Sequence, residues 1–260
     1  MFNIQWKASL FYPLASCILL ASCSVQNKVS RSADKEVLQA PALQTAHVGI
    51  SIFEPATNKY WYEYQGDKYF VPASNTKIPT CYAAMKYLGD SLAGLKYVSF
   101  LNNKGEKSYW IQSTGDPTFL HPDFSNQPVL DFFKKDTAAE FFLVSAKQWE
   151  DTPWGSGWTW GDYTAYYMAE RSQFPIYGNV LRINGSEKGI SITPDRFEFA
   201  YNGKGEATAF DRNYNKYSFG REMANNKFLW RRDSTGVKNE EIPFITSIPL
   251  TVTLLKDAVP

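Results

Sequence analysis

Apolar and polar residues alternate in the stretch HVGISIFEPATNKYWYEY at residues 47–64. Every second residue is apolar from Val48 to Ile52, and a tyrosine takes every second position from Tyr60 to Tyr64. The Pro55–Asn58 segment between them has the composition of a turn. Because this alternation places one face of each strand on a buried side, the pattern predicts a β-hairpin.

A helix is predicted directly after the hairpin. One face of this helix would carry positions 74, 77, 78, 81, 85 and 88, and Gly89 would end it. Pro79 has no backbone N–H to donate, so we expect the regular helix to begin around Asn75 or Thr76, with Pro79 near the permissive first turn. The expected order is strand, strand, helix.

The remaining pattern is mixed and mostly of the strand type. Expected strands are SYWIQST at 108–114, FFLVSA at 141–146, and 179–184, 189–193 and 196–201, with a helix in PVLDFFKKD and a Gly/Trp loop at 154–161. The final stretch, IPLTVTLLKDAV, is apolar and runs to the end of the sequence. This ending is the pattern expected of a sequence cut from a longer one.

The first 23 residues have the pattern of an export signal. Lys7 precedes about fifteen mostly apolar residues, ASLFYPLASCILLAS, a run too short to span a bilayer as a helix. The run ends in Leu-Ala-Ser-Cys, which resembles the bacterial lipobox, in which the cysteine is lipidated and begins the mature chain. We therefore expect lipidation at Cys23 rather than at Cys17, which would leave only a stub of the apolar segment. The alternative is a plain secretory peptide cleaved near Ser22.

Composition restricts the class of protein. The 260 residues are 44% hydrophobic, with 27 basic and 26 acidic side chains and a formal charge of +1. This is the composition of a packed globular protein without the basic face that phosphate binding needs, so we do not expect nucleic acid as a partner. Residues 24–45 are polar with little periodicity and are expected to form a tether between the lipid anchor and the folded part.

Few residues suggest chemistry of other kinds. Processing at Cys23 would leave Cys81 as the free thiol, and its place on the apolar face predicts a buried structural cysteine. His47 and His121 lack a further His or Cys at ligand spacing, so neither a metal site nor a Ser/His/Asp triad is expected. The glycines show no phosphate-loop spacing, and no cofactor is predicted.

The region 149–167 is rich in aromatic residues and allows two interpretations. Its rings could stack on glycan rings, or they could pack a Gly-rich loop, and we favour packing. The residues concerned are Trp149, Trp154, Trp158, Trp160, Tyr163, Tyr166 and Tyr167. Asp116 in TGDPT is expected to form a turn beside Pro117.

Ser74 and Lys77 are three residues apart in PASNTK, so on a helix they lie on one face about 5 to 6 Å apart. A serine hydroxyl needs a base to become a good nucleophile, and a lysine serves as that base when its amine is neutral. Free backbone N–H groups at a helix start can also hold an oxyanion. The alternative is structural: Ser74 caps the helix and Lys77 is solvated.

Three stretches together resemble one family. PASNTK at 72–77, STGDPTF at 113–119 and GSGWTWGDYTAYYMAERSQFPIYGN at 155–179 are similar, in this order, to segments of the D-alanyl-D-alanine carboxypeptidase/endopeptidase family of low-molecular-mass penicillin-binding proteins, the peptidase S13 type. The similarity extends over about residues 46 to 260. Ser-x-Asn and Lys-Thr-Gly, the family's later active-site motifs, are absent, and Ser172 in SQFPIYGN occupies a structural segment of the family.

The resemblance implies an α/β (α+β) fold of the serine transpeptidase and β-lactamase type, incomplete at the C-terminus. Residues 46–94 would form the first part of the catalytic domain, 95–245 an inserted, mostly β module, and 246–260 a return to the catalytic domain. Ser74 would be the nucleophile and Lys77 its base. The implied substrate is the stem peptide of peptidoglycan, with β-lactams as covalent inhibitors, on the periplasmic side of the cell envelope. The other hypothesis is a non-catalytic envelope lipoprotein that binds peptidoglycan or a partner protein.

We predict that a fatty acid is attached at Cys23, because the apolar run ends in Leu-Ala-Ser-Cys and a polar segment follows. Metabolic labelling with a radioactive fatty acid should mark the wild-type protein and the Cys17→Ala variant but not Cys23→Ala. Label that survives Cys23→Ala and disappears with Cys17→Ala would contradict the assignment.

Overall fold

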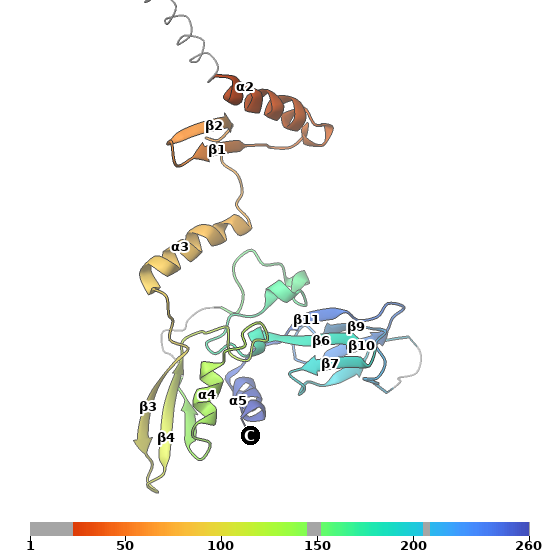
Figure 1. Cartoon of the computed structure of the whole chain (residues 1–260). Coiled ribbons are helices and arrows are strands. Elements are labelled where there is room, and N and C mark those ends of the chain that lie inside the picture. Colours follow the sequence, from red (N-terminus) through yellow and green to blue (C-terminus); the bar gives the residue numbers. More distant parts are fainter. Residues whose placement is uncertain (1–22, 145–151, 205–208, 260) are drawn as a thin grey trace, which may run out of the picture. The chain divides into compact units, whose positions relative to one another are not determined.

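The computed structural model describes residues 23–144, 152–204 and 209–259 (Figure 1). The chain divides into two compact units, one up to Tyr87 and one from Leu88 onward, which are described separately. The expected signal segment at 1–22 lies outside the described residues. Within the described part of the chain, no helix has the length and apolar character needed to cross a bilayer.

The segment 24–45, expected to form a tether, is largely helical in the first unit. Helix α2 (Cys23–Ser32) leads into a π-helical turn η1 (Ala33–Leu38) and a 3₁₀ turn η2 (Pro41–Leu43). The hydroxyl of Tyr62 donates to Asp34 Oδ1 at 2.8 Å, and this contact raises the pKa of Tyr62. Contacts with the following hairpin order this stretch although its own sequence has little periodicity, and its role as a tether stays a prediction.

The predicted hairpin is confirmed. Strands β1 (Ile50–Glu54) and β2 (Lys59–Tyr64) pair antiparallel, with a bulge between Ile52 and Phe53. Asn58 has a φ of 54°, in the left-handed region that asparagine tolerates in turns. The hairpin therefore reverses at the turn expected from the sequence.

The predicted helix is confirmed with a 3₁₀ start, η3 (Ser74–Thr76), followed by α3 (Lys77–Leu88). Gly89 follows the helix with a φ of +78°, which glycine adopts without strain. All α3 side chains except Ala83 are exposed. Cys81 is exposed as well, so the expectation of a buried thiol is wrong for this structure.

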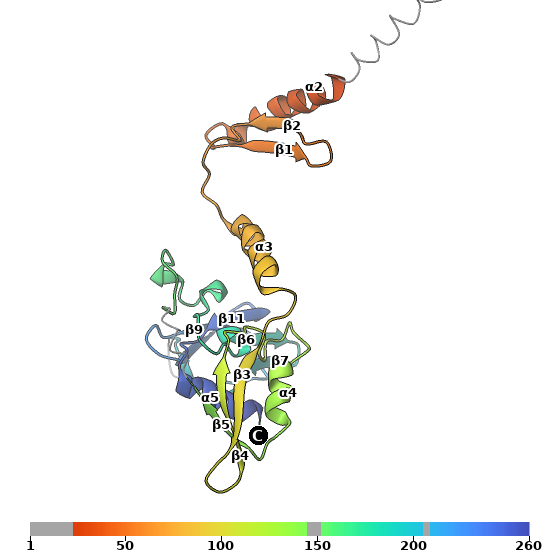
Figure 2. The same cartoon turned by 90° about the vertical axis from the view of Figure 1, so that its left-hand side faces the viewer.

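The second unit begins with a three-stranded sheet of order β3-β4-β5. Strands β3 (Leu95–Leu101) and β4 (Lys107–Ser113) are antiparallel, and β5 (Glu140–Leu143) runs parallel to β4 after helix α4 (Pro128–Lys134). These elements confirm the strands and the helix expected between 108 and 144, and residues 145 and 146 of the last expected strand lie outside the described residues. Both views show this sheet apart from the other two (Figures 1 and 2).

Two further three-stranded sheets complete the unit. One has the order β11-β6-β7 and is antiparallel, and the other has the order β8-β10-β9, with β8 parallel to β10. Their strands are β6 (Val180–Ser186), β7 (Gly189–Thr193), β8 (Phe199–Tyr201), β9 (Tyr217–Arg221), β10 (Phe228–Arg232) and β11 (Asn239–Pro243). The expected strands near 180, 190 and 199 are present, which makes the module mostly β as predicted.

Helix α5 (Ile248–Ala258) packs into the core of this same unit. Ser247 caps it, its hydroxyl accepting the Leu250 N–H at 3.2 Å, and Leu254 and Leu255 are buried beside the sheets. Helix α5 is thus part of the second unit in this structure, and the expected domain boundary at residue 245 stays a prediction. The apolar face of the helix determines its place in this unit, because its burial needs the module's side chains.

A buried arginine joins separate parts of the second unit. Arg221, 3% exposed, donates to the carbonyl oxygens of Pro243 and Glu222, both at 2.8 Å, and of Asn225 at 3.0 Å. Burial lowers the pKa of Arg221, while the charge of Glu170 opposes the shift. The guanidinium thus fixes the end of β9 to the end of β11 and to the turn before β10.

We predict that Arg221→Met destabilises the second unit by roughly 3 kcal/mol or more, because several buried carbonyl groups lose their donor. Arg212→Met is the matched control: Arg212 pairs with exposed Asp195, and loss of such a pair costs at most about 1 kcal/mol. Urea unfolding followed by tryptophan fluorescence measures both. Equal effects of the two substitutions would contradict the role assigned to Arg221.

Candidate functional site

Ser74 and Lys77 meet at the junction of η3 and α3, with Lys77 Nζ 2.9 Å from Ser74 Oγ. The contact has the geometry that the spacing of three residues predicts. Both side chains are exposed in the first unit. The catalytic roles of the pair remain a proposal, which is developed below.

The turn before the helix holds Ser74 in place. The carbonyl of Ala73 accepts the Thr76 N–H at 3.1 Å and the Thr76 hydroxyl at 2.8 Å, while Asn75 Oδ1 accepts the Ala73 N–H at 2.8 Å. Ala73, not Ser74, is the N-cap residue, and no described side chain caps η3. The capping interpretation of Ser74 therefore has no support here, and its hydroxyl is instead bonded to Lys77.

The direction of this hydrogen bond matters for the chemistry. As described, the Lys77 amine donates to the Ser74 oxygen. Activation of a serine requires the reverse, a neutral amine that accepts the hydroxyl proton, and burial of a lysine favours that neutral form. The two atoms are thus close enough for a proton to pass between them.

The segment 113–119 lies in the second unit and has a structural role. Asp116 Oδ1 accepts the Thr118 N–H at 2.9 Å, which confirms Asp116 as a turn former. The Thr114 hydroxyl donates to Gly94 O at 2.9 Å and so holds the turn against the start of β3.

Most of the rings between residues 152 and 168 are exposed, so the expectation that they pack a loop is wrong for these rings, whereas Tyr163 is half-buried. Trp149 lies outside the described residues. The exposed rings are Trp154, Trp158, Trp160, Tyr166 and Tyr167, in a segment containing the 3₁₀ turns η4 (Trp160–Asp162) and η5 (Tyr166–Met168). Polar contacts hold this loop instead: the Thr159 hydroxyl donates to Asp162, and hydrogen bonds from Thr159 and Tyr167 lower the pKa of that carboxyl.

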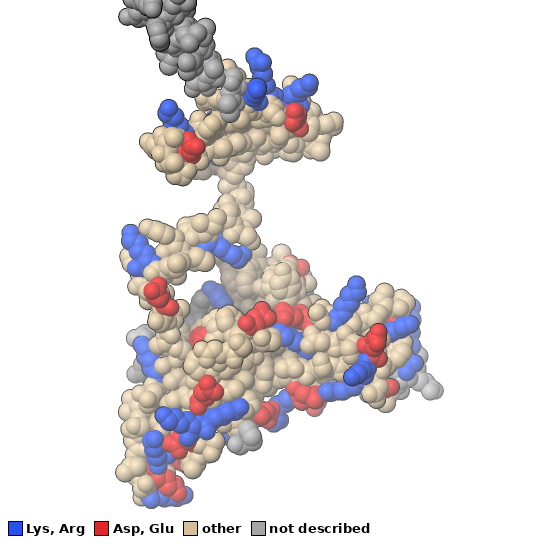
Figure 3. Space-filling view, in the orientation of Figure 1, with Lys and Arg blue, Asp and Glu red and all other residues tan. Residues whose placement is uncertain are grey.

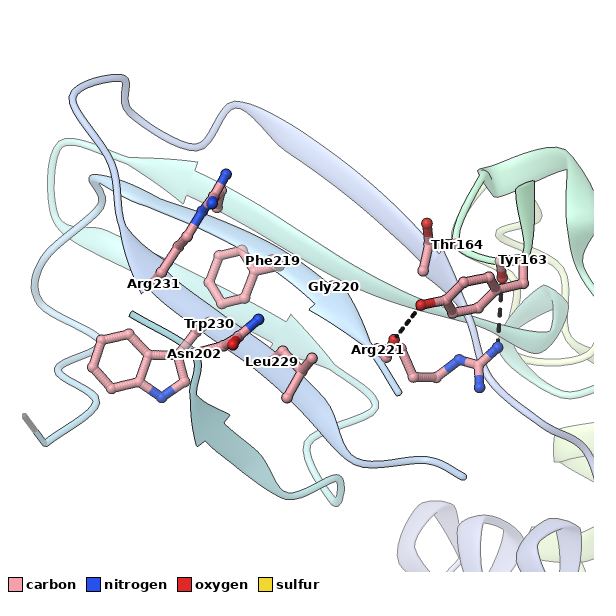
Figure 4. Close-up of a pocket in the computed structure, with 10 residues that line it drawn as sticks. Tyr163, Thr164, Asn202, Phe219, Gly220, Arg221, Leu229, Trp230 and Arg231 are labelled. Carbon is pink, nitrogen blue, oxygen red and sulfur yellow. Dashed lines mark hydrogen bonds between the residues drawn. The ribbon is translucent and has the colours of Figure 1, made fainter. Parts of the chain in front are cut away.

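Tyr163 differs from its neighbours because it is tied to the sheet. Its hydroxyl donates to Arg221 O at 3.0 Å, and the Arg221 guanidinium lies 5.4 Å from the ring centroid. Figure 4 shows the ring beside the end of β9. The loop is thus anchored at one aromatic residue, and its other rings remain outside.

Ser172 and the two histidines serve as structural groups. Ser172 Oγ accepts from Asn179 Nδ2 at 2.9 Å, next to the turn η6 (Tyr177–Asn179). His121 contacts Arg182 Nη2 at 3.2 Å, and His47 stacks edge-on with Phe70 at 4.2 Å. Within residues 23–144, 152–204 and 209–259, no three His, Cys, Asp or Glu side chains form a group that could hold a metal ion.

Sequence reasoning missed a hollow of about 290 Å³ on the outer side of the sheet β8-β10-β9 (Figure 4). The lining comes from the loop at 163–164 and from all three strands or their ends: Tyr163, Thr164, Asn202, Ser218, Phe219, Gly220, Arg221, Leu229, Trp230 and Arg231. These positions are far apart in the sequence and belong to no motif. Only knowledge of the strand pairing could have brought them together.

Comparison with known proteins agrees with the resemblance. Residues 29–196 match the profile of the D-Ala-D-Ala carboxypeptidase 3 (S13) family, and this range is more than half of the chain. The chain therefore belongs to the S13 family of D-Ala-D-Ala carboxypeptidases. All three stretches that resemble the family, with Ser74 and Lys77 among them, fall inside the matched range.

A solved structure has a similar fold. The crystal structure of penicillin binding protein 4 (dacB) from Haemophilus influenzae matches with a TM-score of 0.54 and 16% sequence identity, over 81% of this chain and 49% of that one. The chain thus spans about half the length of that protein, and the mixed α/β fold is shared over this half. No curated protein sequence matches the chain.

Proposed function

We propose that this chain carries the nucleophile and the base of a serine-type D-Ala-D-Ala carboxypeptidase that acts on peptidoglycan stem peptides. The observation that supports this most directly is the 2.9 Å contact between Lys77 Nζ and Ser74 Oγ at the start of a helix. Membership of the S13 family supports the same reaction class. Cleavage of peptide cross-links is a second reaction of the same chemistry.

In the proposed reaction, Ser74 Oγ attacks the carbonyl carbon of the penultimate D-alanine while the neutral Lys77 amine takes the hydroxyl proton. Collapse of the tetrahedral intermediate breaks the peptide bond, and the leaving D-alanine nitrogen takes up a proton. Water then hydrolyses the acyl-serine ester and restores the Ser74 hydroxyl. Backbone N–H groups near the helix start are donors suited to the oxyanion.

The proposal places the reaction in the cell envelope, on the periplasmic side, with the protein held by a lipid on Cys23. This location follows from the expected lipobox and from a substrate that belongs to the cell wall. A β-lactam mimics the D-Ala-D-Ala terminus and should acylate the same serine.

In any version of the protein that also carries Ser-x-Asn and Lys-Thr-Gly segments, we predict that a labelled penicillin acylates Ser74, because Ser74 has a lysine amine within hydrogen-bond distance. Mass spectrometry of the peptide adduct locates the label. Ser74→Ala should abolish labelling, and Ser172→Ala, whose hydroxyl is engaged by Asn179, should retain it. An adduct on Ser172, or full labelling of Ser74→Ala, would show that the nucleophile is misassigned.

A separate prediction concerns the 260-residue chain by itself, which we expect to release little D-alanine from a D-Ala-D-Ala peptide. Its sequence has no Lys-Thr-Gly or Ser-x-Asn segment, and loss of a single oxyanion donor costs on the order of 100- to 1,000-fold in rate. An assay of D-alanine release with Ser74→Ala as the blank measures this. Turnover near one per second that Ser74→Ala abolishes would contradict the prediction. Absence of acylation at Ser74 in a version that carries both later segments would favour the binding-lipoprotein hypothesis instead.

A further inference from the structure

The hollow on the sheet β8-β10-β9 is lined by the cation Arg231 and by polar groups, and Gly220 leaves its base without a side chain. Gly220 and Leu229 face each other across β9 and β10, and a Cβ at Gly220 would meet no atom within 4 Å. Tyr163 stands at one end of the hollow, and Arg231 lies at the other (Figure 4). A small ligand could therefore lie over Gly220 between an aromatic ring and a guanidinium.

Arg231 is held so that part of its guanidinium remains available. Its Nε donates to Ser218 Oγ at 2.9 Å, on the residue that pairs with it across the sheet. Among the described residues, no side chain or carbonyl accepts a hydrogen bond from its two terminal nitrogens. A guanidinium fixed through Nε presents both terminal nitrogens to one incoming carboxylate, the bidentate arrangement that arginine favours.

The other lining residues complement an amide next to that carboxylate. Asn202 follows β8, and its backbone N–H donates to Trp230 O at 2.8 Å, which fixes the residue at the hollow. Figure 4 shows its side-chain amide beside Leu229, between that residue and Trp230. Leu229 offers an apolar surface for a small side chain, while Thr164 adds a hydroxyl. A peptide end could therefore place its amide at Asn202, a methyl-sized side chain at Leu229 and its terminal carboxylate at Arg231.

We propose that this hollow is a non-catalytic binding site for the C-terminal carboxylate of a short peptide, with Arg231 as its anchor. The identity of the peptide rests on the proposed function, which makes a stem peptide ending in D-alanine the natural occupant. The site would hold the substrate on the second unit without taking part in bond cleavage.

One acidic residue, Asp233, acts on the charge of Arg231. Asp233 interacts with Arg231 electrostatically, and its carboxylate accepts hydrogen bonds from the backbone N–H and the hydroxyl of Thr235. Asp233 thus competes with an incoming carboxylate for the same cation. Removal of this competing charge should strengthen binding, whereas removal of the cation should weaken it.

The test is equilibrium binding of N-acetylated L-Lys-D-Ala-D-Ala to the chain in a Ser74→Ala background, which prevents turnover. Isothermal titration calorimetry compares the free acid with its C-terminal amide. Arg231→Gln should weaken binding of the acid at least about tenfold, as expected for a lost charge-assisted pair. Gly220→Val should weaken binding of the acid to a similar extent, because the new side chain fills the space above residue 220. Asp233→Asn should tighten binding about two- to threefold.

Arg232→Gln is the matched control, since Arg232 is the next residue of the strand and lies over the Tyr214 ring, 5.3 Å from its centroid. Affinity unchanged in Arg232→Gln supports the assignment. Equal affinity for acid and amide, an equal loss in Arg232→Gln, or displacement of the peptide by an equal concentration of sulfate would each overturn it. Because Ser74 is absent from this experiment, failure here leaves penicillin acylation of Ser74 as an independent test of the proposed function.

Discussion

The buried guanidinium of Arg221 is the constraint on which the arrangement of the second unit most depends. A charged group at 3% exposure is tolerated only when its donors are satisfied, and here carbonyl groups from β11, from the turn before β10 and from the 163 loop surround it. Two hydrogen bonds of 2.7 Å between Asn226 and Ile245 join the same turn to the end of β11. The geometry of the guanidinium fork therefore fixes where the aromatic loop leaves the sheets and, with it, one wall of the hollow beside Gly220.

In the first unit, local pattern was sufficient for the hairpin and for the site serine, but not for residues 24–45. The alternation around Tyr62 predicted the hairpin, and the spacing of Ser74 and Lys77 predicted their contact, because both are determined by residues close in sequence. The pattern failed at 24–45, where a polar stretch is helical through a contact 28 residues away, from Asp34 to Tyr62. A helix that is stabilised by such a distant partner need not show a hydrophobic periodicity in its own sequence.

The aromatic loop and the hollow could not be predicted from composition or net charge. Composition alone favoured burial of the tryptophans, yet Trp160 is 78% exposed, because hydrogen bonds and Arg221 hold the loop without their help. The acidic and basic residues of the second unit are interspersed on the face that Figure 3 shows, so net charge gave no indication of a local site either. Arg231, Asn202 and Gly220 come together only through the register of β8, β9 and β10.

The pairing of β6 with β11 also determines when this unit can fold. Arg182 on β6 and Glu241 on β11, which are joined at 2.7 Å, are separated by 59 residues, and strands β7 to β10 lie between them. At a synthesis rate of about 5 to 20 residues per second, β6 waits roughly 3 to 12 s for this edge partner. Through that interval one edge of β6 has no partner strand. The strand carries apolar side chains, such as Leu181 and Ile183, that are buried only in the folded unit. The order of strands thus makes the growing chain vulnerable to aggregation in a way that the finished sheet is not.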